Sequence, residues 1–145
     1  MSIRDKLPGV LGFGGAPLGN MFRAIPEDEA LATVQGAWNA GVRYFDTAPF
    51  YGSGLSELRM GEALKQYDRD QYVLSSKVGR LVLDEVEDVS ARDLGDKAGV
   101  FDHGRPNKLV NDYSADATLR SIEDSLKRLQ TDRLDSRHCS GLLPR

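Results

Sequence analysis

Residues 41–64 read GVRYFDTAPFYGSGLSELRMGEAL, and this stretch decides the fold. Residues 42–46 are mostly β-branched or aromatic and predict a strand that ends at an aspartate. The next residues are rich in glycine, proline and serine, which predicts a loop. Ser56 then begins a helix whose apolar side chains recur near one face. A strand that runs through a loop into a helix is the first half of a βαβ unit, so this stretch predicts an α/β fold.

The same alternation continues on both sides of this stretch. Upstream, residues 9–15 predict a short strand that ends in glycines, and Pro26 opens a helix with an acidic first turn. Downstream, residues 72–77 predict a third strand, and Ser114 is a good N-cap for an amphipathic helix. Strands that alternate with helices at this rhythm indicate a parallel sheet.

Two segments do not follow this rhythm. Residues 81–112 are charged, contain glycine and lack periodicity, so we expect an extended loop there. Residues 133–135 are expected to lead into a fourth strand. The following segment, SRHCSGLLPR at 136–145, lacks β-branched side chains and carries turn-forming ones instead. We therefore do not expect it to form that strand.

Composition indicates a soluble globular domain. Of the 145 residues, 40% are hydrophobic and 28% are charged, and the formal net charge is −3. This mild charge predicts neither a nucleic-acid nor a membrane partner. The first residues lack the apolar core of a secretory signal, and the single cysteine, Cys139, excludes an internal disulfide. These observations favour the cytoplasm.

Three side chains capable of acid–base chemistry fall near the ends of predicted strands. Asp46 ends one strand, Tyr51 lies in the loop after it, and Lys77 ends the next strand. The C-terminal ends of parallel strands meet at one rim, where barrels of such strands build their active sites. We therefore expect these three side chains to lie close together.

The three residues together predict a tuned general acid. A free tyrosine hydroxyl has a pKa of about 10 and is a reluctant proton donor at neutral pH. A lysine cation stabilises a phenolate, and a carboxylate keeps that lysine charged and in place. Tyr51 would protonate a carbonyl oxygen as hydride arrives at carbon, and take the proton from an alcohol in reverse. Taken singly, the residues also fit a capping aspartate, a packing tyrosine and a solvated lysine.

Several stretches resemble the aldo-keto reductase superfamily. Residues 41–64 resemble its motif of glycine, an aromatic residue before Asp-Thr-Ala, Tyr-Gly, and glutamate and glycine in the next helix. VLSSKVG at 73–79 resembles the strand that holds the family's catalytic lysine. LGFGGAPLGN at 11–20 resembles the family's first strand and the loop after it. Residues 112–135 resemble the helix before strand four. The segment with FDHGRP resembles the branch containing D-threo-aldose 1-dehydrogenase, L-fucose dehydrogenase and pyridoxal 4-dehydrogenase.

This resemblance implies a fold and an activity. The fold is a (β/α)8 TIM barrel, with residues 1–135 forming its N-terminal part, about the first three to four β/α units. The activity is that of an NAD(P)-dependent oxidoreductase. Such an enzyme interconverts a small-molecule carbonyl, for example an aldose or a pyridoxal-like aldehyde, and its alcohol or lactone by hydride transfer.

The resemblance also implies which residues form the site. The implied catalytic residues are Asp46, Tyr51 and Lys77. Gly14, Gly15 and Ala16 match the loop near the nicotinamide ribose, and with Asp46 they are expected to contact NAD or NADP. No metal is implied. A tight turn explains Gly15 equally well.

The C-terminal residues depart from the family pattern. The family's fourth catalytic residue is a histidine within Leu-Asp-x-Val-x-x-His-Asp, whereas Leu134-Asp135 are followed here by Ser136. His138 is near in sequence but out of register with that pattern, and we assign it no role. Read one base out of step, codons for SRHCSGL can encode Leu-Val-Ile-Val-Gln-Asp. We therefore hypothesise that residues 136–145 are a frameshifted tail.

A second interpretation stays open at this point. The late strands that supply the family's pyrophosphate and adenine contacts are not in this sequence, so we expect the 145-residue chain alone to be inactive. It would then be an inert product or one that acts by association. Open sheet edges would favour self-association, because their unpaired backbone groups can bind another strand.

Overall fold

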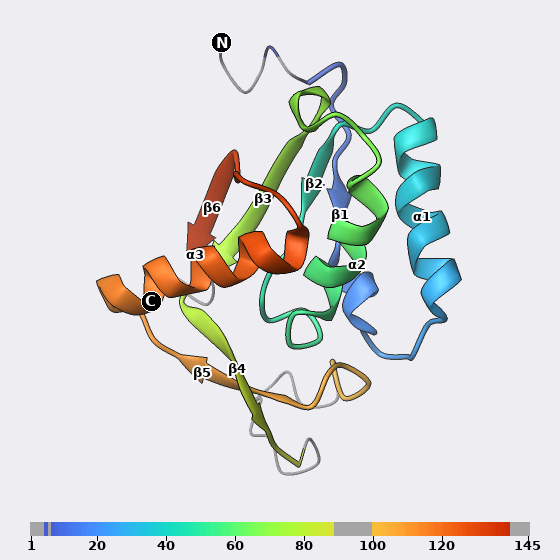
Figure 1. The fold of residues 1–145 in the computed structure, drawn as a ribbon. Helices are drawn as coiled ribbons and strands as arrows, with labels where there is room; N and C mark the ends of the chain where they lie inside the picture. Colours follow the sequence, from blue (N-terminus) through green and yellow to red (C-terminus); the bar gives the residue numbers. More distant parts are fainter. Residues whose placement is uncertain (1–4, 6, 89–99, 140–145) are drawn as a thin grey trace.

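The structure is a computed structural model that describes residues 5, 7–88 and 100–139. Its main feature is a parallel sheet of four strands in the order β1-β2-β3-β6 (Figure 1). The strands are β1 (Phe13–Gly14), β2 (Tyr44–Asp46), β3 (Val73–Val78) and β6 (Ser136–Cys139). The predicted α/β fold with a parallel sheet is confirmed.

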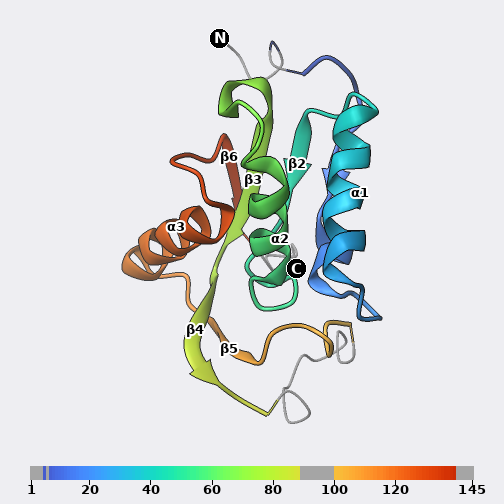
Figure 2. The ribbon, with the colours of Figure 1, turned by 45° about the vertical axis from the view of Figure 1, so that its right-hand side comes forward.

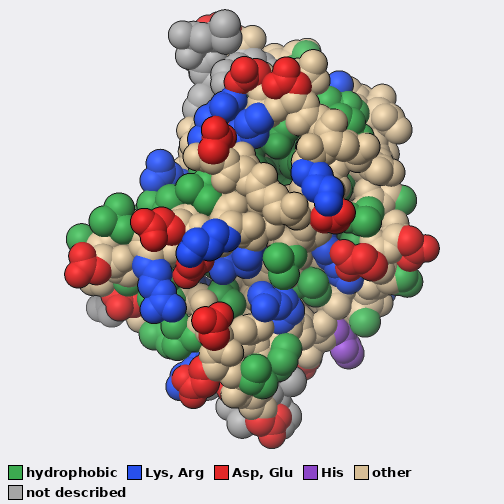
Figure 3. All heavy atoms as spheres, in the orientation of Figure 1, with side chains coloured by type: hydrophobic (Ala, Val, Ile, Leu, Met, Phe, Trp, Pro, Cys, Tyr) green, Lys and Arg blue, Asp and Glu red, His purple; other side chains and the backbone are tan. Residues whose placement is uncertain are grey.

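Three helices connect the strands and cover one face of the sheet (Figures 1 and 2). They are α1 (Glu27–Asn39), α2 (Leu55–Leu64) and α3 (Ala115–Leu129), joined by the short 3-10 helices η2 (Ala16–Gly19) and η3 (Arg69–Gln71). The predicted cap of α3 is present, because the Ser114 hydroxyl accepts a hydrogen bond from the backbone N–H of Ala117. Acidic and basic side chains are interspersed over the face in Figure 3, as expected for a solvated helix layer.

The hydrophobic core lies between the sheet and these helices. Phe45 of β2 and Leu74 of β3 are buried against α2 residues that include Met60 and Leu64. Side chains alternate along a strand, so the neighbours of Phe45 and Leu74 point to the opposite face. That face carries polar side chains near the ends of β2 and β3.

Within the described residues the sheet does not close into a barrel. β1 and β6 each pair with a strand on one side only. A closed barrel of this class uses eight parallel strands, and the open four-stranded sheet agrees with the predicted part of such a barrel. In the described part of the chain, no helix is both long enough and apolar enough to cross a membrane.

The expectation of an extended loop over residues 81–112 is wrong at both ends of this range. Strands β4 (Arg80–Val86) and β5 (Asn107–Asn111) form a separate antiparallel sheet. Leu81 and Val82 are buried, and the Ser121 hydroxyl of α3 donates to the backbone carbonyl of Arg80. The pairing joins residues far apart in sequence, so no local periodicity signals it. Residues 89–99 lie outside the described part of the chain.

The expectation that no fourth strand follows Asp135 is also wrong. β6 pairs in parallel with β3, with Ser136 opposite Ser75 and His138 opposite Lys77. Strand pairing uses backbone groups, so the lack of β-branched side chains weakens a strand without forbidding it. The side chains from Arg137 to Cys139 are exposed at this free edge.

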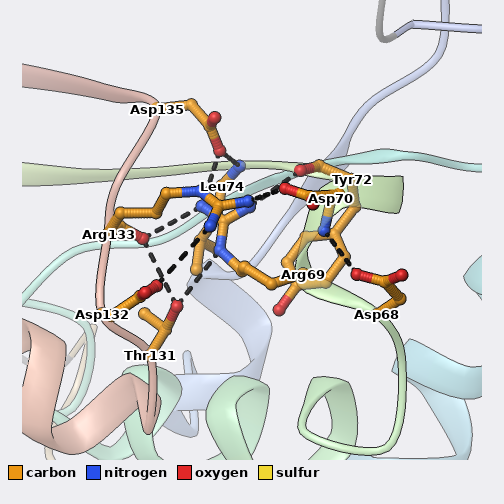
Figure 4. A network of polar contacts seen from close by, with 9 residues as sticks. All are labelled: Asp68, Arg69, Asp70, Tyr72, Leu74, Thr131, Asp132, Arg133 and Asp135. Atoms are coloured by element: carbon orange, nitrogen blue, oxygen red, sulfur yellow. Dashed lines mark hydrogen bonds and ion pairs between the residues drawn. The ribbon is translucent and has the colours of Figure 1, made fainter.

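A polar network at the start of β6 holds this strand against β3 (Figure 4). The Asp135 carboxylate accepts from the Arg69 guanidinium at 2.6 Å and from the backbone N–H of Leu74 at 2.9 Å. Arg69 also donates to the backbone carbonyls of Tyr72 and Arg133. One arginine thereby joins η3, β3 and the segment that leads into β6.

We expect Arg69→Ala to lower the free energy of unfolding by about 3–5 kcal/mol, because it removes the cation from a buried carboxylate. The side chains of Arg69 and Asp135 are only 14% and 9% exposed. The matched control is Arg133→Ala, whose partner Asp70 is 79% exposed, and its expected cost is below about 1 kcal/mol. Urea unfolding followed by the fluorescence of Trp38 measures both. Equal losses of unfolding free energy in the two variants would contradict the conclusion that Arg69 and Asp135 hold β6 against β3.

Candidate active site

Asp46 and Lys77 form an ion pair at the C-terminal end of the sheet. Lys77 Nζ lies 2.7 Å from Asp46 Oδ2, and it also donates to the backbone carbonyl of Thr47 at 3.0 Å. The Lys77 side chain is 20% exposed and the Asp46 side chain 28% exposed, so solvent screens the pair only partly. β2 and β3 are adjacent and in register, which places these residues on the same face of the sheet.

Tyr51 comes from the loop after β2 and lies beside Lys77. Lys77 Nζ is 5.1 Å from the centroid of the Tyr51 ring. Gly52, Ser53 and Gly54, which follow the tyrosine, all have positive φ values, and they turn the chain sharply into α2. The structure thus brings Asp46, Tyr51 and Lys77 together at one rim. We call these three residues the rim trio.

Ser75 contacts the Asp46 carboxylate and Tyr44 contacts Ser75, and the sequence patterns singled out neither residue. The Ser75 hydroxyl donates to Asp46 Oδ1 at 2.6 Å, and the hydroxyl groups of Ser75 and Tyr44 are hydrogen-bonded at 3.1 Å. Both Asp46 oxygens are therefore held, one by Lys77 and the other by Ser75. Strand alternation places Tyr44 and Ser75 on the face of the rim trio, since each lies two positions before one of its members, but it does not specify these hydrogen bonds.

The loop after β1 approaches Asp46 through glycine. The Gly15 N–H donates to the Asp46 carbonyl at 2.7 Å. A Cβ at Gly15 would lie 2.9 Å from the Asp46 carbonyl oxygen and 2.8 Å from Met60 Cε and Ser56 Oγ, so close packing against the backbone favours glycine here. A Cβ at Gly14 would meet nothing within 4 Å, which leaves open space at that residue. Ala16 begins η2.

His138 lies one strand further along the sheet from Lys77. It is the register partner of Lys77, so it faces the same side of the sheet. Its ring is exposed, and its Nε2 is 3.5 Å from the Ser136 hydroxyl. Among the described residues there is no cluster of three or more histidine, cysteine or acidic side chains that could hold a metal ion.

Comparison with known proteins identifies the family. The Aldo/keto reductase family model matches residues 10–139, and the chain belongs to this family. It is 44% identical to D-threo-aldose 1-dehydrogenase of Pseudomonas sp over 126 residues, which are 86% of this chain and 37% of the relative. It is 37% identical to L-galactose dehydrogenase of Arabidopsis thaliana, over 91% of this chain and 34% of the relative. Pyridoxal 4-dehydrogenase of Microbacterium luteolum is also 37% identical, over 86% of this chain and 37% of its own length.

Solved structures agree with this assignment. The holo form of an aldo-keto reductase from Bacillus halodurans matches with a TM-score of 0.63 and 29% identity, over 89% of this chain and 35% of that one. An aldo-keto reductase from Klebsiella pneumoniae in complex with NADPH matches with a TM-score of 0.58 and 26% identity, over 87% and 33% of the two chains. This chain therefore spans about a third of the length of its relatives, 34–37% of the curated ones above.

Proposed function

We propose that the rim trio is the proton-transfer part of an NAD(P)-dependent oxidoreductase site. The observation that carries the proposal is the Asp46–Lys77 ion pair at 2.7 Å, with the Tyr51 ring beside the same ammonium group. Tyr51 protonates the substrate carbonyl oxygen, or takes the proton from an alcohol in the reverse direction. Lys77 stabilises the phenolate that results, and Asp46 keeps Lys77 in place.

The proposed cofactor contacts lie next to the rim trio. Gly14, Gly15 and Ala16 form the loop beside Asp46, and the open space at Gly14 is compatible with a nicotinamide ribose. NAD or NADP supplies or accepts the hydride when bound. The bound NADPH of the Klebsiella pneumoniae relative supports a nicotinamide cofactor for this site.

We propose an aldose or a pyridoxal-like aldehyde as the carbonyl substrate, because relatives named for such substrates match 86% of this chain. The test is a complete barrel that carries residues 1–135, assayed by absorbance of the reduced cofactor. Each substrate is tested with NAD(H) and with NADP(H) in both directions. Turnover with one of these classes is expected. No turnover with any pair, by a folded barrel that binds the cofactor, would overturn the proposal.

We further propose that residues 1–135 are the barrel portion and residues 136–145 a frameshifted tail. The support is the loss of the family pattern directly after Leu134-Asp135. Codons for SRHCSGL, read one base out of step, can encode Leu-Val-Ile-Val-Gln-Asp, which has the spacing of that pattern but glutamine at the histidine position. The backbone pairing of β6 is compatible with this proposal because it does not depend on side-chain identity. Sequencing the gene across these codons is the test. A verified gene with no barrel-coding sequence in any frame would overturn it.

A second candidate function is association without catalysis. The observation that favours it is that β1 and β6 each leave one edge unpaired among the described residues, with Val10 and Leu11 exposed just before β1. Such edges can pair with those of a second copy. Sedimentation of the purified 145-residue chain is expected to show mass above the monomer. A monomer at all concentrations would exclude this function.

A further inference from the structure

The segment with FDHGRP contacts Tyr51 directly. Phe101 is only 4% exposed although it precedes an exposed turn. Its ring stacks on the Tyr51 ring, with centroids 5.7 Å apart and planes at 28°. It also makes an edge contact with Phe50, at a centroid distance of 5.2 Å. Phe101 is therefore packed against the loop that carries Tyr51. The proposed proton transfer does not itself involve Phe101.

Backbone hydrogen bonds fix residues 100–105 to the loops that surround the site. The Val100 carbonyl accepts from the Phe22 N–H at 2.8 Å, in the loop after β1. On the other side, the Arg105 N–H donates to the Gly52 carbonyl at 3.1 Å, and its guanidinium donates to the Ser53 carbonyl at 3.2 Å. Burial, followed by repulsion from Arg128, lowers the pKa of Arg105, but an arginine stays charged at neutral pH.

Asn20 joins residues 100–105 to the body of the domain. Its side-chain amide donates to the His103 carbonyl at 2.8 Å, and its Oδ1 accepts from Arg59 of α2 at 2.7 Å. Arg59 is buried, and it also donates to the Leu18 and Ile25 carbonyls. The contact therefore extends into the core and does not rest on surface side chains alone.

Three glycines allow the backbones to meet without intervening side chains. A Cβ at Gly104 would lie 2.6 Å from Gly52 Cα, and a Cβ at Gly19 would lie 2.5 Å from the Tyr51 carbonyl carbon. Gly52, with φ of 66°, is thus held between the other two glycines. Packed backbones of this kind leave little room for movement, which favours a fixed wall over an opening cover.

We infer that residues 100–105 form a fixed wall of the active-site rim and that Phe101 is a positioning residue, which holds the Tyr51 ring so that its hydroxyl faces the reacting carbonyl. The inference rests on the proposed role of Tyr51. Proton transfer requires a heavy-atom approach of roughly 3 Å, so a Tyr51 side chain that exchanged freely between χ1 rotamers would carry its hydroxyl out of reach for much of the time. Phe101 acts through the orientation of Tyr51 and not by contact with the substrate.

The test observes the Tyr51 ring itself. The 145-residue chain is labelled with 3-fluorotyrosine, and its five tyrosines are expected to give separate fluorine NMR signals. The signal that disappears in Tyr51→Phe belongs to Tyr51. In Phe101→Ala, we expect that signal to move and broaden, because the Tyr51 side chain exchanges between χ1 rotamers. Phe101→Leu, which keeps apolar bulk and loses the aromatic stack, is expected to move it part of the way.

Internal signals separate positioning from unfolding. The signals of the other tyrosines are expected to keep their positions in both variants, which shows that the domain stays folded. The matched control is Phe13→Ala, because the Phe13 ring contacts Phe45 and its loss is expected to leave the Tyr51 signal unchanged. If Phe101→Ala unfolds the domain, the position of the Tyr51 signal in Phe101→Leu tests the inference instead.

An unmoved Tyr51 signal in a folded Phe101 variant would overturn the inference. The readout does not depend on turnover. A complete barrel that proves inactive would therefore overturn the proposed function and leave the positioning result intact.

Discussion

The 145-residue chain, mixed with NAD(P)H and an aldose or pyridoxal, is expected to oxidise the cofactor no faster than a buffer control. The rim trio can supply a proton, but hydride transfer also requires the nicotinamide to be held against the carbonyl. Such positioning can account for about 7–11 kcal/mol of barrier lowering. The chain spans only about a third of its relatives' length, and its proposed cofactor contacts are confined to Asp46 and the loop at Gly14, Gly15 and Ala16.

The measurement compares this chain with a complete barrel that carries the same residues 1–135. Loss of reduced-cofactor absorbance is followed at equal protein concentration, and circular dichroism checks that both proteins are folded. The complete barrel is expected to oxidise the reduced cofactor, and the short chain is expected to leave it unchanged. Equal rates per mole of the two proteins would show that residues 1–145 hold a sufficient cofactor site.

Tyr51→Phe in that complete barrel is expected to lower kcat by about 10²–10⁴-fold, the usual contribution of a positioned general acid. This equals about 3–5 kcal/mol of transition-state stabilisation. The substitution removes only the hydroxyl, and the ring can keep its contacts with Lys77 and Phe101. The KM for the cofactor is therefore expected to change little.

A second tyrosine provides the control. Tyr67 stacks on Trp38 at a centroid distance of 3.8 Å, and Trp38 lies on α1, in the helix layer and away from the rim trio. Tyr67→Phe also loses one phenolic hydroxyl and is expected to keep full activity. If Tyr51→Phe retains kcat within about threefold of the Tyr67→Phe value, another group donates the proton and the assignment is wrong.

Local sequence patterns were sufficient for strands β1, β2 and β3 of the main sheet. The alternation of short strands with capped helices predicted parallel pairing, and the helix starts at Pro26 and Ser114 agree with the structure. The positions of Asp46 and Lys77 at strand ends placed them at one rim, because parallel strands share a direction. These conclusions depend on periodicity and caps, which each segment carries by itself.

Patterns failed where a structure depends on distant partners. β4 and β5 pair across a long intervening segment, and neither is long or strongly alternating by itself. β6 forms next to β3 from residues of low strand propensity, because Arg69 fixes Asp135 at its start. Local propensity is a weak guide in such cases, since pairing and burial override it.

The sequence by itself determined the family, the parallel order of the predicted strands and the rim residues Asp46, Tyr51 and Lys77, because these follow from motifs and side-chain periodicity. Only the tertiary structure decided how the rim is supported. The Ser75 hydroxyl on Asp46 and the Phe101 ring on Tyr51 each join residues from different segments of the chain. Contacts of this kind exist only after the segments have packed together, and for that reason no single stretch of sequence encodes them.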